Sequence, residues 1–272
     1  MANDTTGLAF ENFIQRSSTI LTKVAAPWGK LIRTMPLDKN KTPGQPAKLF
    51  FVSDGPTAQI SANPDWTAGT CEITPVSIPM VPVVTTVGTD VDLNLGLTTQ
   101  MLFEACARAQ SVAIQELILS VFSTANGYAT AATVTAPNFG SQDFDKMFVS
   151  VPSPERAIIL APEFFAKVRP PTWFAPNFDS VYEQSTWTGG ETNLVGLTAA
   201  PGCAILVYAK PEISPIGQNV IRSSSFTVPQ LGIDVSASLY FLPATREMRF
   251  ALSVYIGIAP ADTTAATLLL SS

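Results

Sequence analysis

The sequence predicts an α+β protein built from two subdomains, and three patterns in it support this fold class. Apolar residues recur every three or four positions over residues 98–122, which is typical of a long helix. Apolar and polar residues alternate strictly over residues 233–258, which is typical of two paired strands with one buried face. Between these segments, short apolar strands and a helix that begins at a proline predict a second, smaller subdomain.

The predicted long helix has a hydrophobic side with small residues at its centre. Thr98 or Thr99 is a suitable N-cap, because a hydroxyl there accepts a hydrogen bond from the first turn. The apolar positions are Leu102, Ala105, Cys106, Ala109, Ala113, Leu117 and Val121. We expect this alanine-rich seam to lie flat against a sheet or against another backbone.

The predicted hairpin comes late in the chain, with Pro243-Ala244-Thr245-Arg246 as its turn. Its apolar positions are Ile233, Val235, Ala237, Leu239, Phe241, Met248, Phe250, Leu252, Val254, Ile256 and Ile258. We expect the long helix to cover this apolar face.

The first 75 residues have little pattern of a compact core. Residues 8–24 predict a short amphipathic helix that includes Phe10 and Phe13. The following stretch is rich in proline and glycine, which predicts an extended excursion with one short strand at Ala47 to Val52. Such loops are uncommon inside a compact domain and are usually functional. Strand-like alternation resumes at Val76.

The predicted second subdomain has short elements. Residues 128–140 are expected to be loop and Phe144 to Val151 a helix, followed by a strand at Ala157 to Leu160 and a helix from Pro162. Residues 172–200 predict an aromatic loop that contains Trp173 and Trp187, and Ala204 to Tyr208 predict another buried strand. The aromatic loop suits either a ligand platform or a protein–protein interface, where Trp is enriched.

The composition excludes several classes of function. The chain contains no His, so it cannot form a Ser-His-Asp triad, a Cys-His pair or a His-based zinc site. Its three Cys have neither disulfide-framework nor metal-cluster spacing, which favours a reducing compartment. We therefore expect no catalytic residue, no metal and no cofactor, and we predict that the protein is not an enzyme. No signal peptide and no membrane span are expected.

Charge is scarce and unevenly distributed. Only 14% of the residues are charged, against about 25% in average soluble proteins, which suggests that other subunits cover much of the surface. Residues 1–50 hold seven basic and three acidic residues, whereas the other 222 hold nine basic and eighteen acidic ones. This asymmetry suits either a solvated basic arm or a basic arm laid over the acidic body of a neighbouring copy.

The order of these elements resembles that of tailed-bacteriophage major capsid proteins, which have the Hong Kong-phage type of coat fold and share it with encapsulins. The resemblance lies in a strand leading into a long helix (Val87–Phe122), a strand leading into a proline-started helix (Arg156–Val168) and the late hairpin (Gly232–Gly257). Two short sequence segments add to the resemblance. They are Leu231 to Val235, before the final strands, and Tyr240 to Arg246, at the turn.

The resemblance implies a division of the chain into four parts. Residues 1–35 would be an N-terminal arm, 36–75 an E-loop, 76–135 with 226–272 a peripheral domain, and 136–225 an axial domain. The arm and the E-loop would lie across adjacent subunits. The candidate contacts between subunits are Phe10, Phe13, Arg16, Lys30, Arg33, Lys39, Lys41, Lys48, Trp66, Trp173 and Trp187.

The resemblance also implies a function and partners. The chain would assemble with itself into pentamers and hexamers of a closed icosahedral shell in the host cytoplasm. The shell, located in the virion, would enclose double-stranded DNA without sequence-specific binding and work with portal, scaffolding or decoration proteins. An encapsulin-like compartment shell is one alternative, and a monomeric α+β ligand-binding protein is another.

Overall fold

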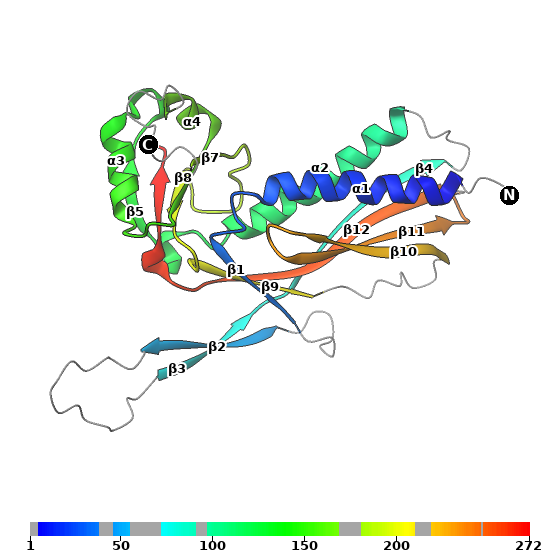
Figure 1. Ribbon diagram of the computed structural model, residues 1–272, viewed down its shortest axis with the longest axis horizontal. Coiled ribbons are helices and arrows are strands. Elements are labelled where there is room, and N and C mark those ends of the chain that lie inside the picture. Colours follow the sequence, from blue (N-terminus) through cyan, green and yellow to red (C-terminus); the bar gives the residue numbers. More distant parts are fainter. Residues whose placement is uncertain are drawn as a thin grey trace.

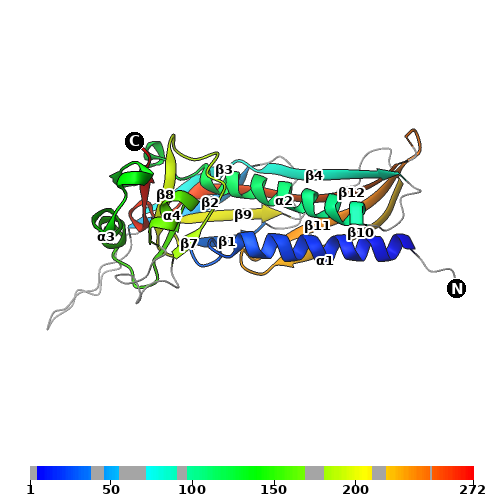
Figure 2. The ribbon, with the colours of Figure 1, turned by 90° about the horizontal axis from the view of Figure 1, so that it is seen from above.

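The computed structural model describes residues 5–37, 46–54, 72–90, 97–168, 181–209, 219–245 and 247–272. The described part is elongated, with a larger sheet under two helices at one end and a smaller sheet at the other (Figures 1 and 2).

The larger sheet is mostly antiparallel and draws strands from both ends of the chain. Its strand order is β1-β9-β12-β11-β10, and β4 pairs with the other side of β12. These strands are β1 (Ile32–Pro36), β4 (Val81–Asp90), β9 (Ala204–Ala209), β10 (Asn219–Val228), β11 (Ile233–Leu242) and β12 (Glu247–Pro260). The pair β11–β12 is the late hairpin that the alternation predicts.

Two parallel helices cover one face of this sheet, α1 (Thr5–Ala25) and α2 (Leu97–Leu119) (Figure 1). Their shared core centres on three rings: Phe13 of α1, Phe103 of α2 and Phe250 of β12. The centroid distances are 5.1 Å for Phe13–Phe103, 5.3 Å for Phe13–Phe250 and 4.6 Å for Phe103–Phe250. Such edge-on and tilted contacts stabilise beyond the area that they bury, so α1 is a firmly seated part of this layer.

The smaller sheet forms a second layer with its own core. Its strand order is β5-β13-β8-β6-β7, and the core includes Phe139, Phe144, Met147 and Phe164. The elements are β5 (Ala129–Thr133), α3 (Ser141–Ser150), β6 (Ala157–Leu160), α4 (Pro162–Val168), β7 (Val181–Glu183), β8 (Leu194–Ala199) and β13 (Ala266–Leu270). Single 3-10 turns lie at Thr124–Asn126, Ala136–Asn138 and Thr263–Ala265.

A hairpin of β2 (Ala47–Asp54) and β3 (Glu72–Ile78) forms a separate two-stranded sheet that projects from the body (Figure 1). Its base is anchored, because Ala47 and Ile78 are buried with Ile205, Val207 and Ala259 of the larger sheet. This hairpin occupies the segment in which the sequence predicts an extended excursion with one strand.

The expected division into domains differs from the sheets at four strands. Strand β9 and most of β10 lie in the range expected for the axial domain but belong to the larger sheet. Strands β5 and β13 lie in the peripheral range but belong to the smaller sheet. The chain therefore crosses between the layers more often than predicted. The reason is that backbone pairing between distant segments decides sheet membership.

Three local predictions also need correction. Residues 128–140 are not all loop, because β5 pairs in parallel with β13. Residues 172–200 are not all loop either, because they contain β7 and β8. The alanine-rich seam of α2 is only partly its buried side: Cys106 is buried, whereas Ala105 and Ala109 are exposed. Phe103 and Ile114, which lie outside the predicted seam, are buried in the core.

Candidate assembly surfaces

The structure places the predicted contact residues in three different environments. Phe10 and Phe13 are buried in the protein's own core, which differs from the expectation that they contact another subunit. They lie three residues apart on one helix face, and this face packs inside the protomer. Lys30, Arg33 and Lys48 are exposed. Lys39, Lys41, Trp66 and Trp173 lie outside the described residues.

The side chains of Arg16 and Trp187 make their contacts within the protomer. The Arg16 guanidinium donates to Glu104 at 2.5 Å and to Gln100 at 2.9 Å, so it joins α1 to α2. Trp187 is partly buried against the cores of the larger and the smaller sheet, and its Nε1 donates to the Gln184 carbonyl at 2.7 Å. These contacts assign structural roles to two residues that sequence reasoning placed at an interface.

The described residues offer little for chemistry at a small-molecule site. No group of three His, Cys, Asp or Glu side chains in them could hold a metal ion. Burial raises the pKa of the Cys106 thiol and of the Cys203 thiol to about 12, so both stay protonated and poorly nucleophilic near neutral pH. No helix in this part of the chain is long and apolar enough to cross a membrane.

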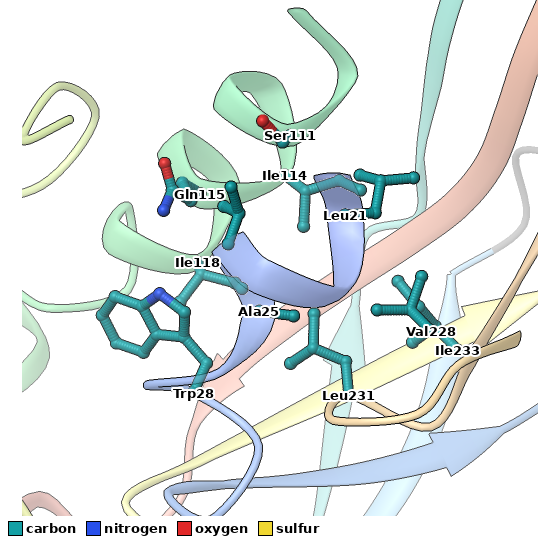
Figure 3. A pocket seen from close by; sticks show the side chains of 11 residues that line it. Leu21, Ala25, Trp28, Ser111, Ile114, Gln115, Ile118, Val228, Leu231 and Ile233 are labelled. Carbon is teal, nitrogen blue, oxygen red and sulfur yellow. The ribbon is translucent and has the colours of Figure 1, made fainter. Parts of the chain in front are cut away.

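An apolar pocket lies between α1, α2 and the β10–β11 turn (Figure 3). Its walls include Leu21, Ile114, Ile118 and Leu231, and its cavity volume of about 10 Å³ leaves room for one water at most. The nearby Trp28 Nε1 is buried without a hydrogen-bond partner. This pocket is a packing defect between elements, too small for a substrate.

The two long outer strands of the larger sheet lie against different helices, β4 against α2 and β10 against α1. At β4, the fully buried Gln110 of α2 donates to the Val83 carbonyl at 3.1 Å and accepts from the Thr85 hydroxyl at 2.6 Å. The Cys106 thiol contacts the Thr85 carbonyl at 3.7 Å. Side chains of α2 thus contact the carbonyls of Val83 and Thr85 and join the helix to β4.

Strand β10 forms the opposite border of the larger sheet. It pairs with β11 along one edge, and no described strand pairs with its other edge. Val220 to Ser225 are all exposed. The strand has ten residues, one charged side chain and no proline. The sequence patterns do not predict β10.

Comparisons with known proteins relate this fold to shell-forming proteins. No family model and no curated protein matches the sequence. The solved structures that are similar include a virus-like particle from Pyrococcus furiosus, with a TM-score of 0.58, 10% identity and coverage of 95% of this chain and 98% of that chain.

Two further capsids have similar scores. The capsid of a native gene transfer agent particle has a TM-score of 0.56 and 11% identity, covering 91% of this chain and 90% of that one. The capsid of Cyanophage P-SCSP1u has a TM-score of 0.54 and 11% identity, covering 90% and 86%. The chain therefore has the phage capsid fold over almost its whole length, as its order of elements predicts.

Proposed function

We propose that this chain is the major capsid protein of a tailed bacteriophage, which assembles into an icosahedral head shell around double-stranded DNA. The observation that carries the proposal is the shared fold, which extends over at least 90% of the chain in each of the three capsid and particle structures. Closed symmetry lets many weak contacts add up to a stable shell.

Features outside the core support a role in assembly. The β2–β3 hairpin stands away from both main sheets and is held at its base (Figure 1). Forming a projecting hairpin gains little stability within one protomer, because an isolated two-stranded sheet is marginal in water. Contacts with a neighbouring subunit would supply the stabilisation that the hairpin lacks within one protomer.

We assign the contacts between subunits to the exposed basic residues Lys30, Arg33 and Lys48, together with the predicted residues outside the described part. They belong to the basic first 50 residues, whereas the rest of the chain is acidic. Opposite charges across an interface guide approach and set register. Phe10, Phe13, Arg16 and Trp187 are left out of this set because they pack or pair within the protomer.

The proposal extends to partners. The net charge of −5 suits a lumen that repels packaged DNA and keeps it mobile, without sequence-specific binding. Portal, scaffolding and decoration proteins would be separate chains, and assembly would take place in the host cytoplasm.

A protein compartment shell is the second candidate, and the similarity to the Pyrococcus furiosus virus-like particle favours it. The two candidates differ in their cargo. Shells isolated from native producing cells would contain genomic DNA in the first case and a folded cargo protein in the second.

Light scattering of the purified recombinant protein, with negative-stain microscopy of any large fraction, tests assembly. We expect closed shells, or pentamers and hexamers that convert to shells. A stable monomer under all salt and protein concentrations would overturn the proposal and favour the ligand-binding alternative. Nuclease-protected DNA in shells from native cells then distinguishes a phage head from a compartment.

A further inference from the structure

The outer face of α3 carries a large apolar side chain that is open to solvent. Val149 exposes 72% of its surface, more than any other large apolar residue in the described part of the chain. It lines a shallow, open hollow together with Gln142, Asp145, Lys146 and Ser150. A single exposed apolar residue needs no explanation by itself, so the charges around Val149 decide what this face can bind.

The charges on α3 leave one carboxylate without a partner in the described part of the chain. The Lys146 Nζ lies 3.3 Å from Asp143 Oδ1, so these two charges offset each other. Asp145 is exposed and forms no ion pair with a described residue. It lies four residues before Val149, on the same face of the helix. The face therefore presents a negative charge and an apolar group about 6 Å apart along the helix, at ~1.5 Å per residue.

The exposed side of β1 presents the complementary pair. Arg33 and Met35 lie two residues apart, so they stand on the same side of the strand, and both are exposed. No described carboxylate forms an ion pair with Arg33. Two residues of a strand span about 6.6–6.8 Å. This spacing is close to that between Asp145 and Val149, so a positive charge and an apolar group on β1 can meet their counterparts on α3 together.

Two other basic residues lie near exposed apolar side chains, but both already interact within the chain. Arg108, four residues before Val112, forms an ion pair with Glu104 at 3.5 Å. Arg222, two residues after Val220, also takes part in an interaction of its own. Strand β1 therefore offers the best match to α3 among the described elements.

The charges also decide which surface of a second copy can cover α3. A two-fold contact between two α3 helices would set like against like and bring two Asp145 carboxylates together. Helix α3 packs on the smaller sheet at one end of the body, whereas β1 is a border strand of the larger sheet (Figure 1). A contact between α3 of one copy and β1 of another thus joins two different surfaces. Repeated contacts of this kind generate a ring when the rotation between subunits closes.

We propose that the outer face of α3 in one copy docks on the exposed side of β1 in the next copy, with Asp145 opposite Arg33 and Val149 against Met35. This contact rests on the proposed shell function, for which it supplies a contact between neighbours in a ring of subunits. It also gives Arg33, one of the basic residues assigned to subunit contacts, a specific acceptor. The opposite charges set the register of the two surfaces, and the apolar pair excludes water between them.

Cysteine crosslinking tests the apolar half of the contact. In a Cys71→Ser background, Met35→Cys chains are mixed with Val149→Cys chains, assembled under reducing conditions and treated with a short bismaleimide. We expect crosslinked dimers of unlike chains in about tenfold greater yield than from either chain alone, because the contact joins two different surfaces. Val84→Cys mixed with Val149→Cys is the matched control. Val84 is an exposed apolar residue on β4, so this mixture should give only the background yield.

Charge reversal tests the polar half of the contact. Arg33→Glu alone and Asp145→Arg alone should each raise the protein concentration needed for assembly by about tenfold, because like charges then face each other in every repeat of the contact. Arg33→Glu combined with Asp145→Arg should restore the parental value. Arg33→Glu combined with Glu163→Arg has the same net charge but reverses an exposed carboxylate on α4, so its assembly should stay impaired.

Light scattering and microscopy of every variant separate the two levels of the proposal. Normal shells with only background crosslinking between Met35→Cys and Val149→Cys would overturn this contact and leave the proposed function intact. Failure of the paired reversal to restore assembly, or equal restoration by the Glu163→Arg control, would overturn it in the same way. If the unmodified chain and the Cys71→Ser parent both form no shells, the proposed function fails and this contact fails with it.

Discussion

At the scale of single residues, Phe13 connects the first helix to the rest of the larger layer. Its side chain is fully buried and contacts the rings of Phe103 and Phe250. Truncating a buried Phe to Ala removes apolar area and leaves a cavity, which costs about 3–5 kcal/mol. We predict that Phe13→Ala lowers the free energy of unfolding in denaturant by this amount. Leu8→Ala on the exposed side of α1 is the control and should change it by less than about 0.5 kcal/mol; equal effects of both would show that Phe13 is not a core residue.

The buried thiols make the free energy of unfolding fall at alkaline pH. Burial raises the pKa of Cys106 and Cys203 to about 12, whereas thiols in the unfolded chain ionise near about 8.5. Between these values the unfolded state releases protons that the folded state retains, so the free energy of unfolding falls as pH rises from about 9 to 12. Denaturant titrations at pH 8 and pH 10.5 measure the fall. A Cys106→Ala, Cys203→Ala variant should show a smaller fall, and an unchanged one would contradict this origin.

At the scale of elements, the segments with a strong local period were predictable and those defined by distant pairing were not. The helices over residues 8–24 and 98–122 and the hairpin over 233–258 are confirmed, because burial on one face imposes a period of 3.6 or 2 on the sequence. Strands β1, β5, β7, β8, β10 and β13 are not predicted. They owe their conformation to partners elsewhere in the chain, as when β13 pairs with both β5 and β8.

The same reasoning explains which candidate contact residues were misplaced. An aromatic residue such as Phe10 suits a core or an interface equally well, and only the packing of α1 on α2 decides between them. A basic side chain is rarely buried without a partner, and Lys30, Arg33 and Lys48 are exposed. Whether they contact another subunit remains part of the proposal.

The junction between the β2–β3 hairpin and the larger sheet depends on one glycine. A Cβ added at Gly257 would lie 2.7 Å from the Pro79 carbonyl oxygen and 2.8 Å from the Ile78 side chain. We predict that Gly257→Ala forces these elements apart and destabilises the protein by about 1–3 kcal/mol, as overpacking usually does. Thermal unfolding of Gly88→Ala is the control, since a Cβ there meets its nearest atom at 3.5 Å. If both variants unfold at the parent temperature, the hairpin base is looser than described.

At the scale of the whole molecule, the two main sheets and their helices stabilise the protomer, whereas the β2–β3 hairpin projects beyond it. The two sheets and their helices bury the three core clusters, whereas the hairpin contributes Ala47, Ile78 and the residues beside them to the smallest one. A protomer that lacks the distal hairpin should therefore fold but lose the contacts that the hairpin makes with neighbours.

This separation leads to a deletion that distinguishes folding from assembly. Ala47 pairs directly with Ile78, so an Asn-Gly turn can replace residues 48–77 and close the chain at the hairpin base. We predict that the melting temperature stays within about 4 °C of the parent, the shift that 1 kcal/mol causes in a protein of this size. Light scattering should show no shells at concentrations where the full chain assembles, because each subunit has lost its projecting contacts. Shells of normal size from the deleted chain would mean that the sheets and helices alone supply the interfaces.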